Sequence, residues 1–132
     1  MRYPIVIEPG NDTRAYGVIV PDLPGCYSAG DTLDEAITNS SEAILAHIEH
    51  LIESGEAISE PKSIEQHQNN TDYRGWLWAI STVDLAQLKE PCRRINITIP
   101  ERVLAMVDLA AKKAGESRSG YLAAAALERA SH

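Results

Sequence analysis

Residues 93–101, Arg93-Arg94-Ile95-Asn96-Ile97-Thr98-Ile99-Pro100-Glu101, decide how the C-terminal part of this chain folds. From residue 94 onward, polar side chains alternate with isoleucines without interruption. This pattern predicts a strand with one apolar face and one face that carries Arg94, Asn96 and Thr98. Pro100 ends the strand and suits the first turn of a helix, where its missing N–H costs nothing. The stretch therefore predicts a short strand that leads directly into a helix.

Two helices separated by a tight turn are predicted after this strand. Gly115 is suited to end the first helix and Ser117 to cap the second. A lone short strand can neither pair its edges nor bury three isoleucines, so two copies are expected to pair antiparallel above four helices. The sequence therefore predicts a homodimer. The predicted apolar faces are Val103, Val107, Ala110 or Ala111 and Ala114 for the first helix, and Tyr121, Leu122, Ala125 and Ala126 for the second.

The polar face of the paired strands is suited to reading operator DNA. A two-stranded ribbon fits the major groove of B-DNA. There Arg94 can read guanine, Asn96 can read adenine and Thr98 can touch the thymine methyl group. The alternative is a module that only dimerises and leaves this face in water. Backbone amides at the start of a helix bind phosphate well, and the expected phosphate-binding residues are Arg93, Ser117, Arg118 and Ser119.

The N-terminal part of the chain has the pattern of an α+β domain with one helix packed on an antiparallel sheet. Strands are expected at residues 3–8, 16–20, 26–29 and 76–83. Thr32 begins a capping box with Glu35, and Gly55 is a natural stop for the helix between them. Residues 56–72 are expected to form a long loop. The apolar stripe of the helix is Leu33, Ile37, Ser40, Ile44, Ile48, Leu51 and Ile52.

Charge is distributed unevenly along the 132 residues, whose formal net charge is −7. Residues 1–90 hold 15 acidic and 5 basic side chains, a net charge of −10, whereas residues 91–132 hold 4 acidic and 7 basic ones, a net charge of +3. An acidic body joined to a basic tail indicates two surfaces with two different partners. Without a signal peptide or a long apolar run, the chain is expected to be cytoplasmic and to bind no membrane.

A catalytic site or a metal site is the more specific alternative to a purely structural role for several residues of the N-terminal domain. His47 and His50 have a spacing that a metal could use, but no third ligand is evident. Cys26 could act as a nucleophile, although a buried thiol at a strand start explains it equally well. Asp22 and Asp31 are better explained as turn formers. We therefore expect no catalytic residue, no metal and no cofactor. Trp76 and Trp78 share one strand face and are expected to pack on the helix, the alternative being an aromatic patch for a protein partner.

Two stretches resemble known families, in the order in which they occur here. Residues 93–101 resemble the opening of ribbon-helix-helix repressors. Residues 22–36, Asp22-Leu23-Pro24-Gly25-Cys26-Tyr27-Ser28-Ala29-Gly30-Asp31-Thr32-Leu33-Asp34-Glu35-Ala36, are similar to the signature of HicB antitoxins. The resemblance implies a type II antitoxin whose partial ribonuclease-H-like or ferredoxin-like N-terminal sheet covers a HicA-type ribonuclease toxin. Asp22, Pro24, Gly25 and Tyr27 are the toxin-binding candidates that it implies.

The patterns predict two domains, and the resemblance implies an antitoxin that represses its own operon. The expected divisions are a toxin-neutralising domain at residues 1–84, a linker at 85–92 and a ribbon-helix-helix (β-α-α) domain at 93–132. The expected partners are a HicA-type toxin, double-stranded operator DNA and a second copy of the chain, as a dimer or a dimer of dimers. A stand-alone repressor with a ligand-sensing N-terminal domain is the second hypothesis, and a hydrolase tethered to DNA is the third.

Overall fold

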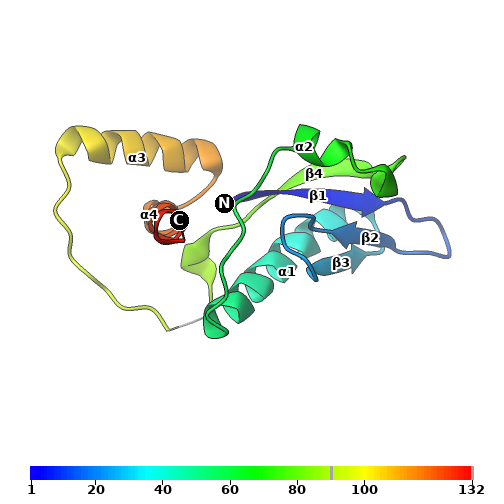
Figure 1. Ribbon diagram of the computed structural model, residues 1–132, viewed down its shortest axis with the longest axis horizontal. Coiled ribbons are helices and arrows are strands. Elements are labelled where there is room, and N and C mark those ends of the chain that lie inside the picture. Colours follow the sequence, from blue (N-terminus) through cyan, green and yellow to red (C-terminus); the bar gives the residue numbers. More distant parts are fainter. Residues whose placement is uncertain (90, 132) are drawn as a thin grey trace.

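The computed structural model describes residues 1–89 and 91–131 and has an α+β fold. Figure 1 shows the sheet and its helix on one side of the molecule and the two C-terminal helices on the other. The strands are β1 (Arg2–Glu8), β2 (Tyr16–Ile19), β3 (Tyr27–Gly30) and β4 (Leu77–Thr82). The α-helices are α1 (Leu33–Glu53), α2 (Ile64–Gln68), α3 (Glu101–Ala114) and α4 (Arg118–Ala130), and the 3-10 turns are η1 (Thr71–Tyr73) and η2 (Leu85–Gln87).

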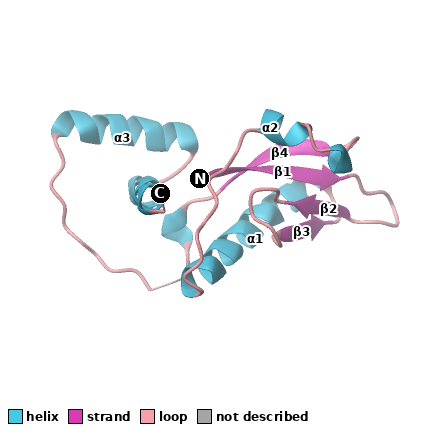
Figure 2. Cartoon of the chain, in the orientation of Figure 1, coloured by secondary structure: helices cyan, strands magenta, loops and turns pink. Residues whose placement is uncertain are grey.

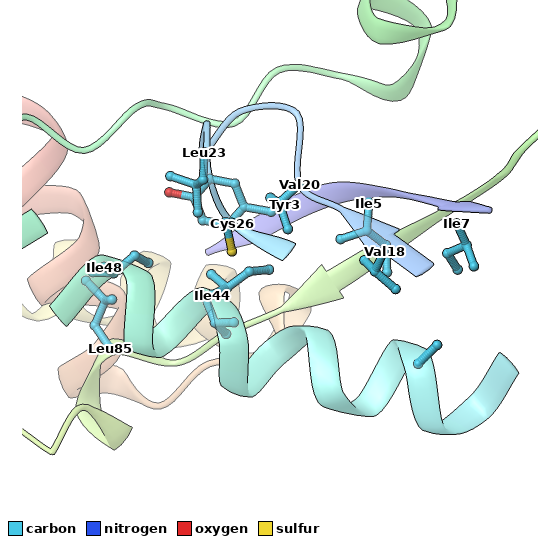
Figure 3. Packing of buried hydrophobic residues seen from close by; sticks show 12 residues of the cluster. Tyr3, Ile5, Ile7, Val18, Val20, Leu23, Cys26, Ile44, Ile48 and Leu85 are labelled. Carbon is cyan, nitrogen blue, oxygen red and sulfur yellow. The ribbon is translucent and has the colours of Figure 1, made fainter. Parts of the chain in front are cut away.

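The four strands form one antiparallel sheet in the order β3-β2-β1-β4. Side chains alternate between the two faces of a strand, so Tyr3, Ile5 and Ile7 of β1 point towards α1. There they meet Ile44 and Ile48, and all five side chains are at most 1% exposed. Figure 3 shows this core, with Leu85 of η2 beside Ile48 at one end. The sheet and α1 therefore enclose a complete core within one chain.

Helix α1 begins and ends where the sequence indicates. The hydroxyl of Thr32 accepts a hydrogen bond from the amide of Glu35 at 3.1 Å, which satisfies one of the free donors of the first turn. The helix ends at Glu53, and Gly55 follows with a φ of 69°, a left-handed conformation that favours glycine. The predicted apolar stripe is the face that packs on the sheet. This confirms the predicted helix.

The opposite face of the sheet is partly covered by residues 59–75, which were expected to be a loop over most of their length. They contain α2 and η1 instead. Figure 1 shows α2 beside β4 and β1. Trp78 is stacked with His67 of α2, with ring centroids 6.2 Å apart, and meets the edge of Tyr73 at 5.8 Å. The prediction that Trp76 and Trp78 pack on α1 is therefore wrong, because the second layer covers the face on which they lie.

The C-terminal half consists of the two predicted helices, connected to the sheet by an extended segment (Figure 2). Gly115 ends α3 with a φ of 71°, and the hydroxyl of Ser117 accepts from the amide of Gly120 at the start of α4. Residues 91–99 form no strand in this single chain, and Ile95 and Ile97 are exposed. A lone strand has no partner for its amides, so pairing with a second copy stays a prediction.

Helix α4 packs on the N-terminal half with a face that differs from the predicted one. Ala125 and Ala126, which were expected to be buried, are exposed. Ala124 and Leu127 pack against the core of the sheet and α1 instead, and Gly120 is buried. The prediction placed α4 beneath a ribbon paired with a second copy, whereas in the single chain η2 supplies an apolar surface for it. Figure 1 shows α4 lying between α3 and the N-terminal half.

Candidate interaction surfaces

The loop that connects β2 to β3 is the first candidate surface, and it is held rigidly. The amide of Leu23 donates to the carbonyl of Val20 at 3.0 Å, and the amide of Cys26 donates to the carbonyl of Leu23 at 2.9 Å. Leu23 and Cys26 point into the core and are 1% and 3% exposed. Gly25 has a φ of 87°, which L side chains rarely adopt. The loop therefore presents Pro24 and Gly25 outward on a fixed backbone.

Asp22 has a different position from the other toxin-binding candidates. It is only 6% exposed, and its carboxylate lies 3.0 Å from Nε2 of His67. The same carboxylate accepts a hydrogen bond from the amide of Lys62 at 3.2 Å. Asp22 thus connects the β2–β3 loop to the segment that covers the sheet. Its buried side chain therefore holds the backbone of this surface in place and is not exposed to a partner.

A row of apolar side chains crosses the outer face of the sheet next to this loop. The strand register places Tyr27 beside Ile19, Ile19 beside Val6, and Val6 beside Trp78. The Trp78 end is covered by α2 and η1, whereas Tyr27 at the other end is 66% exposed. The outer face is therefore closed over β1 and β4 and open over β3. Tyr27 lies on this open side, whereas Pro24 and Gly25 are exposed at the sheet edge towards α1, where the ring of His47 lies near Gly25.

The residues considered for catalysis or metal binding lie in different surroundings. Within residues 1–89 and 91–131, no group of three or more His, Cys, Asp or Glu side chains is arranged to hold a metal ion. His47 is half-buried, and its ring lies near Gly25, whereas His50 is exposed. Burial raises the pKa of the Cys26 thiol to about 11, so this thiol stays protonated at neutral pH. No helix in the described part of the chain is long and apolar enough to span a membrane.

The second candidate surface is the segment that precedes α3. Arg93, Arg94, Asn96 and Thr98 are all exposed in this chain. Large apolar side chains of this segment and of α3 are also exposed, with Ile95 at 70%, Ile97 at 60% and Met106 at 71%. Several exposed large apolar side chains are typical of a chain that binds another protein.

Two of the predicted phosphate-binding residues at the start of α4 have partners within the chain. The amide of Ser117 donates to Oδ2 of Asp84 at 2.9 Å, and its hydroxyl donates to Oδ1 at 3.2 Å. Arg118 makes two hydrogen bonds to the carboxylate of Asp108 on α3, at 2.7 and 2.8 Å. Ser119 is exposed. The sequence does not indicate Asp84 as a partner of Ser117, because nothing near residue 84 connects it to residue 117.

Comparisons with known proteins agree on one family. The model of the family described as HicB-like antitoxin of bacterial toxin–antitoxin systems matches residues 3–126. An uncharacterised 14.9 kDa protein from the rep–hol intergenic region of Haemophilus phage HP1 is 42% identical over 131 residues, which cover 98% of this chain and 97% of that protein.

Solved structures show the same likeness. The crystal structure of the Burkholderia pseudomallei antitoxin HicB has a TM-score of 0.74 and 44% identity, and the match covers 98% of both chains. A chain of the HicA3 and HicB3 toxin–antitoxin complex has a TM-score of 0.54 and 28% identity. That match covers 64% of this chain and 99% of the other.

Proposed function

This chain belongs to the HicB-like antitoxin family of bacterial toxin–antitoxin systems, and on that premise we propose that it inhibits a HicA-type toxin and represses its own operon. The family match, which extends from residue 3 to residue 126, carries the proposal. The partners of the two activities are a HicA-type ribonuclease and double-stranded operator DNA. We propose no catalytic role, and we place the protein in the cytoplasm.

The open side of the outer sheet face is the proposed toxin-binding surface. Likeness to a chain of the HicA3 and HicB3 complex supports a toxin partner. Tyr27 lies there, and Pro24 and Gly25 are exposed on the adjoining β2–β3 loop. Hydrogen bonds already hold the backbone of this loop, so little conformational entropy is lost on binding. The net charge of −10 on residues 1–90 suits a basic, RNA-binding partner and would compete with the phosphates that it otherwise meets.

The segment before α3 is the proposed DNA-reading surface once two chains pair. Antiparallel pairing of residues 94–99 would satisfy the free backbone groups and bury the exposed isoleucines. It would also display Arg94, Asn96 and Thr98 twice, related by a two-fold axis, as a ribbon for the major groove. The net charge of +3 on residues 91–132 supports contact with the DNA backbone.

Toxin binding is tested by co-expressing the chain with the protein encoded next to it. We expect the two to co-purify, and we expect Tyr27→Ala to weaken the complex by at least about thirtyfold, as for a buried interface tyrosine. Leu77→Ala is the matched control, since Leu77 is exposed (43%) on β4 at the opposite edge of the sheet. If the neighbour does not co-purify while DNA binding persists, a repressor with a ligand-sensing N-terminal domain replaces the antitoxin.

DNA binding is tested by a gel shift with the duplex immediately upstream of the reading frame. The double variant Arg94→Ala with Asn96→Ala should abolish the shift and leave the dimer and toxin binding intact. Arg74→Ala removes a positive charge from the N-terminal half and should have little effect. An unchanged shift with the double variant would reject the proposed ribbon.

A further inference from the structure

One carboxylate of the N-terminal half contacts the start of α4. Asp84 follows β4 and accepts hydrogen bonds from the amide and the hydroxyl of Ser117, 33 residues further along the chain. Burial raises the pKa of Asp84, but hydrogen bonds from Ser117 and Ala86 lower it more, so that its pKa lies below the ordinary value. The carboxylate is therefore charged at neutral pH when it contacts α4.

Glycine at residue 120 permits this contact. A Cβ atom at Gly120 would collide with the side chain of Asp84, so the first turn of α4 lies directly against the carboxylate. Further along the helix, Ala124 and Leu127 pack against the core, and the N-terminal nitrogen of Met1 contacts the carboxylate of Glu116 before the helix. The docking of α4 thus combines a polar contact at its start with an apolar contact along its length.

The same amide and hydroxyl belong to the group that a DNA phosphate would use. A phosphate and a carboxylate cannot both occupy the start of one helix, because they compete for the same donors and repel each other. We propose that Asp84 is an intramolecular latch, which occupies the phosphate-binding start of α4 and holds the DNA-binding half in a docked state. This inference rests on the proposed DNA-binding function and adds its regulation. Operator DNA and the latch are then alternatives.

The latch makes operator affinity depend on the equilibrium between docked and released α4. Only the released state offers both the amide and the hydroxyl of Ser117 to a phosphate. The apparent affinity for operator DNA is therefore lower when a smaller fraction of the protein is in the released state. Any partner that binds the N-terminal half and favours release of α4 would tighten operator binding. The contact between Asp84 and Ser117 gives such coupling a physical path.

The test measures binding of the upstream duplex to the full-length chain and to Asp84→Asn. Asparagine keeps the size of the side chain and can still accept from Ser117, so the fold is retained while the competing charge is removed. We expect binding to tighten at least about fivefold, the lower end of typical coupling between sites. The slope of log affinity against log salt should steepen by about 0.9 for each additional phosphate that the protein neutralises. Asp31→Asn, the same change at an exposed position on the sheet side, should leave affinity and slope unchanged.

Gly120→Ala separates the latch from a general effect of charge. It alters no charge and favours the helix, but its methyl group would displace the Asp84 carboxylate. Tighter binding by both variants supports the latch. Unchanged or weaker binding by both, while Arg94→Ala with Asn96→Ala still abolishes the shift, overturns the latch and leaves the DNA-binding role standing. If the unmodified chain does not shift the duplex even at low salt, the DNA-binding proposal fails, and the latch fails with it.

Discussion

The two halves of the chain bury their apolar side chains to very different extents. In the N-terminal half, Tyr3, Ile5, Ile44 and Ile48 are 0% exposed. In the C-terminal half, residues 95–109 leave Ile95, Ile97, Val103, Met106 and Leu109 between 47% and 71% exposed. The first half therefore satisfies its core within one chain. The second half has the composition of an interface, and a single chain supplies only part of the surface that it needs.

The comparison is tested most strongly by one isoleucine from each half. Ile44→Ala should lower the free energy of unfolding by about 2–5 kcal/mol at any protein concentration, because it empties a closed core. Ile97→Ala should cost less than about 0.5 kcal/mol in a dilute single chain, since its side chain is 60% exposed. Urea unfolding followed by circular dichroism at two protein concentrations measures both.

The concentration dependence decides what the exposed isoleucine does. If Ile97 packs in a dimer, the cost of Ile97→Ala should rise with protein concentration, whereas the cost of Ile44→Ala should not. A cost for Ile97→Ala as large as that of Ile44→Ala in dilute solution would contradict the contrast between the halves.

Two glycines, one in each half, allow the packing of the two halves to be compared through smaller expected changes in stability. A Cβ atom at Gly30 would collide with the backbone of Ala36, where β3 meets α1. Gly30→Ala should therefore cost about 1–3 kcal/mol, because neither element can move away from a packed core. Gly120→Ala should cost less, since α4 can move away from Asp84. Gly17→Ala is the control, because its nearest neighbour atom would be 3.9 Å away. Equal losses at residues 30 and 120 would mean that α4 is fixed as firmly as α1.

The N-terminal half could largely be predicted from the sequence, because its signals are local. The Thr32 cap, the stripe through Ile44 and Ile48, and Gly55 define α1 without knowledge of its neighbours. The face on which Trp78 lies could not be predicted, because it depends on a covering segment with little apolar periodicity. That segment had one usable signal, the capping box of Ser63 and Gln66.

The C-terminal half was predictable in its helix ends and less so in its contacts. Gly115 and Ser117 act as the sequence indicates. The buried face of α4 was not predictable, since Ala124 and Leu127 meet a surface from a distant part of the chain. Short apolar residues along α4 fit more than one face, so the neighbour and not the pattern decides which of them is buried. The same holds for Asp84, whose partner is set by tertiary packing.

The two cysteines, one in each half, allow the accessibility of the two halves to be compared without any mutation. Cys26 is 3% exposed and burial raises its pKa to about 11, whereas Cys92 is exposed. At pH 8 only about one Cys26 thiol in a thousand is ionised, so iodoacetamide should modify Cys92 first and Cys26 only after unfolding. Mass spectrometry of tryptic peptides measures the order. Because the folded state holds the Cys26 proton more tightly, this thiol should also lower stability as pH rises from about 9 to 11. Equal labelling rates at pH 8 would show that the β2–β3 loop opens readily and that the N-terminal half is not the rigid part of the molecule.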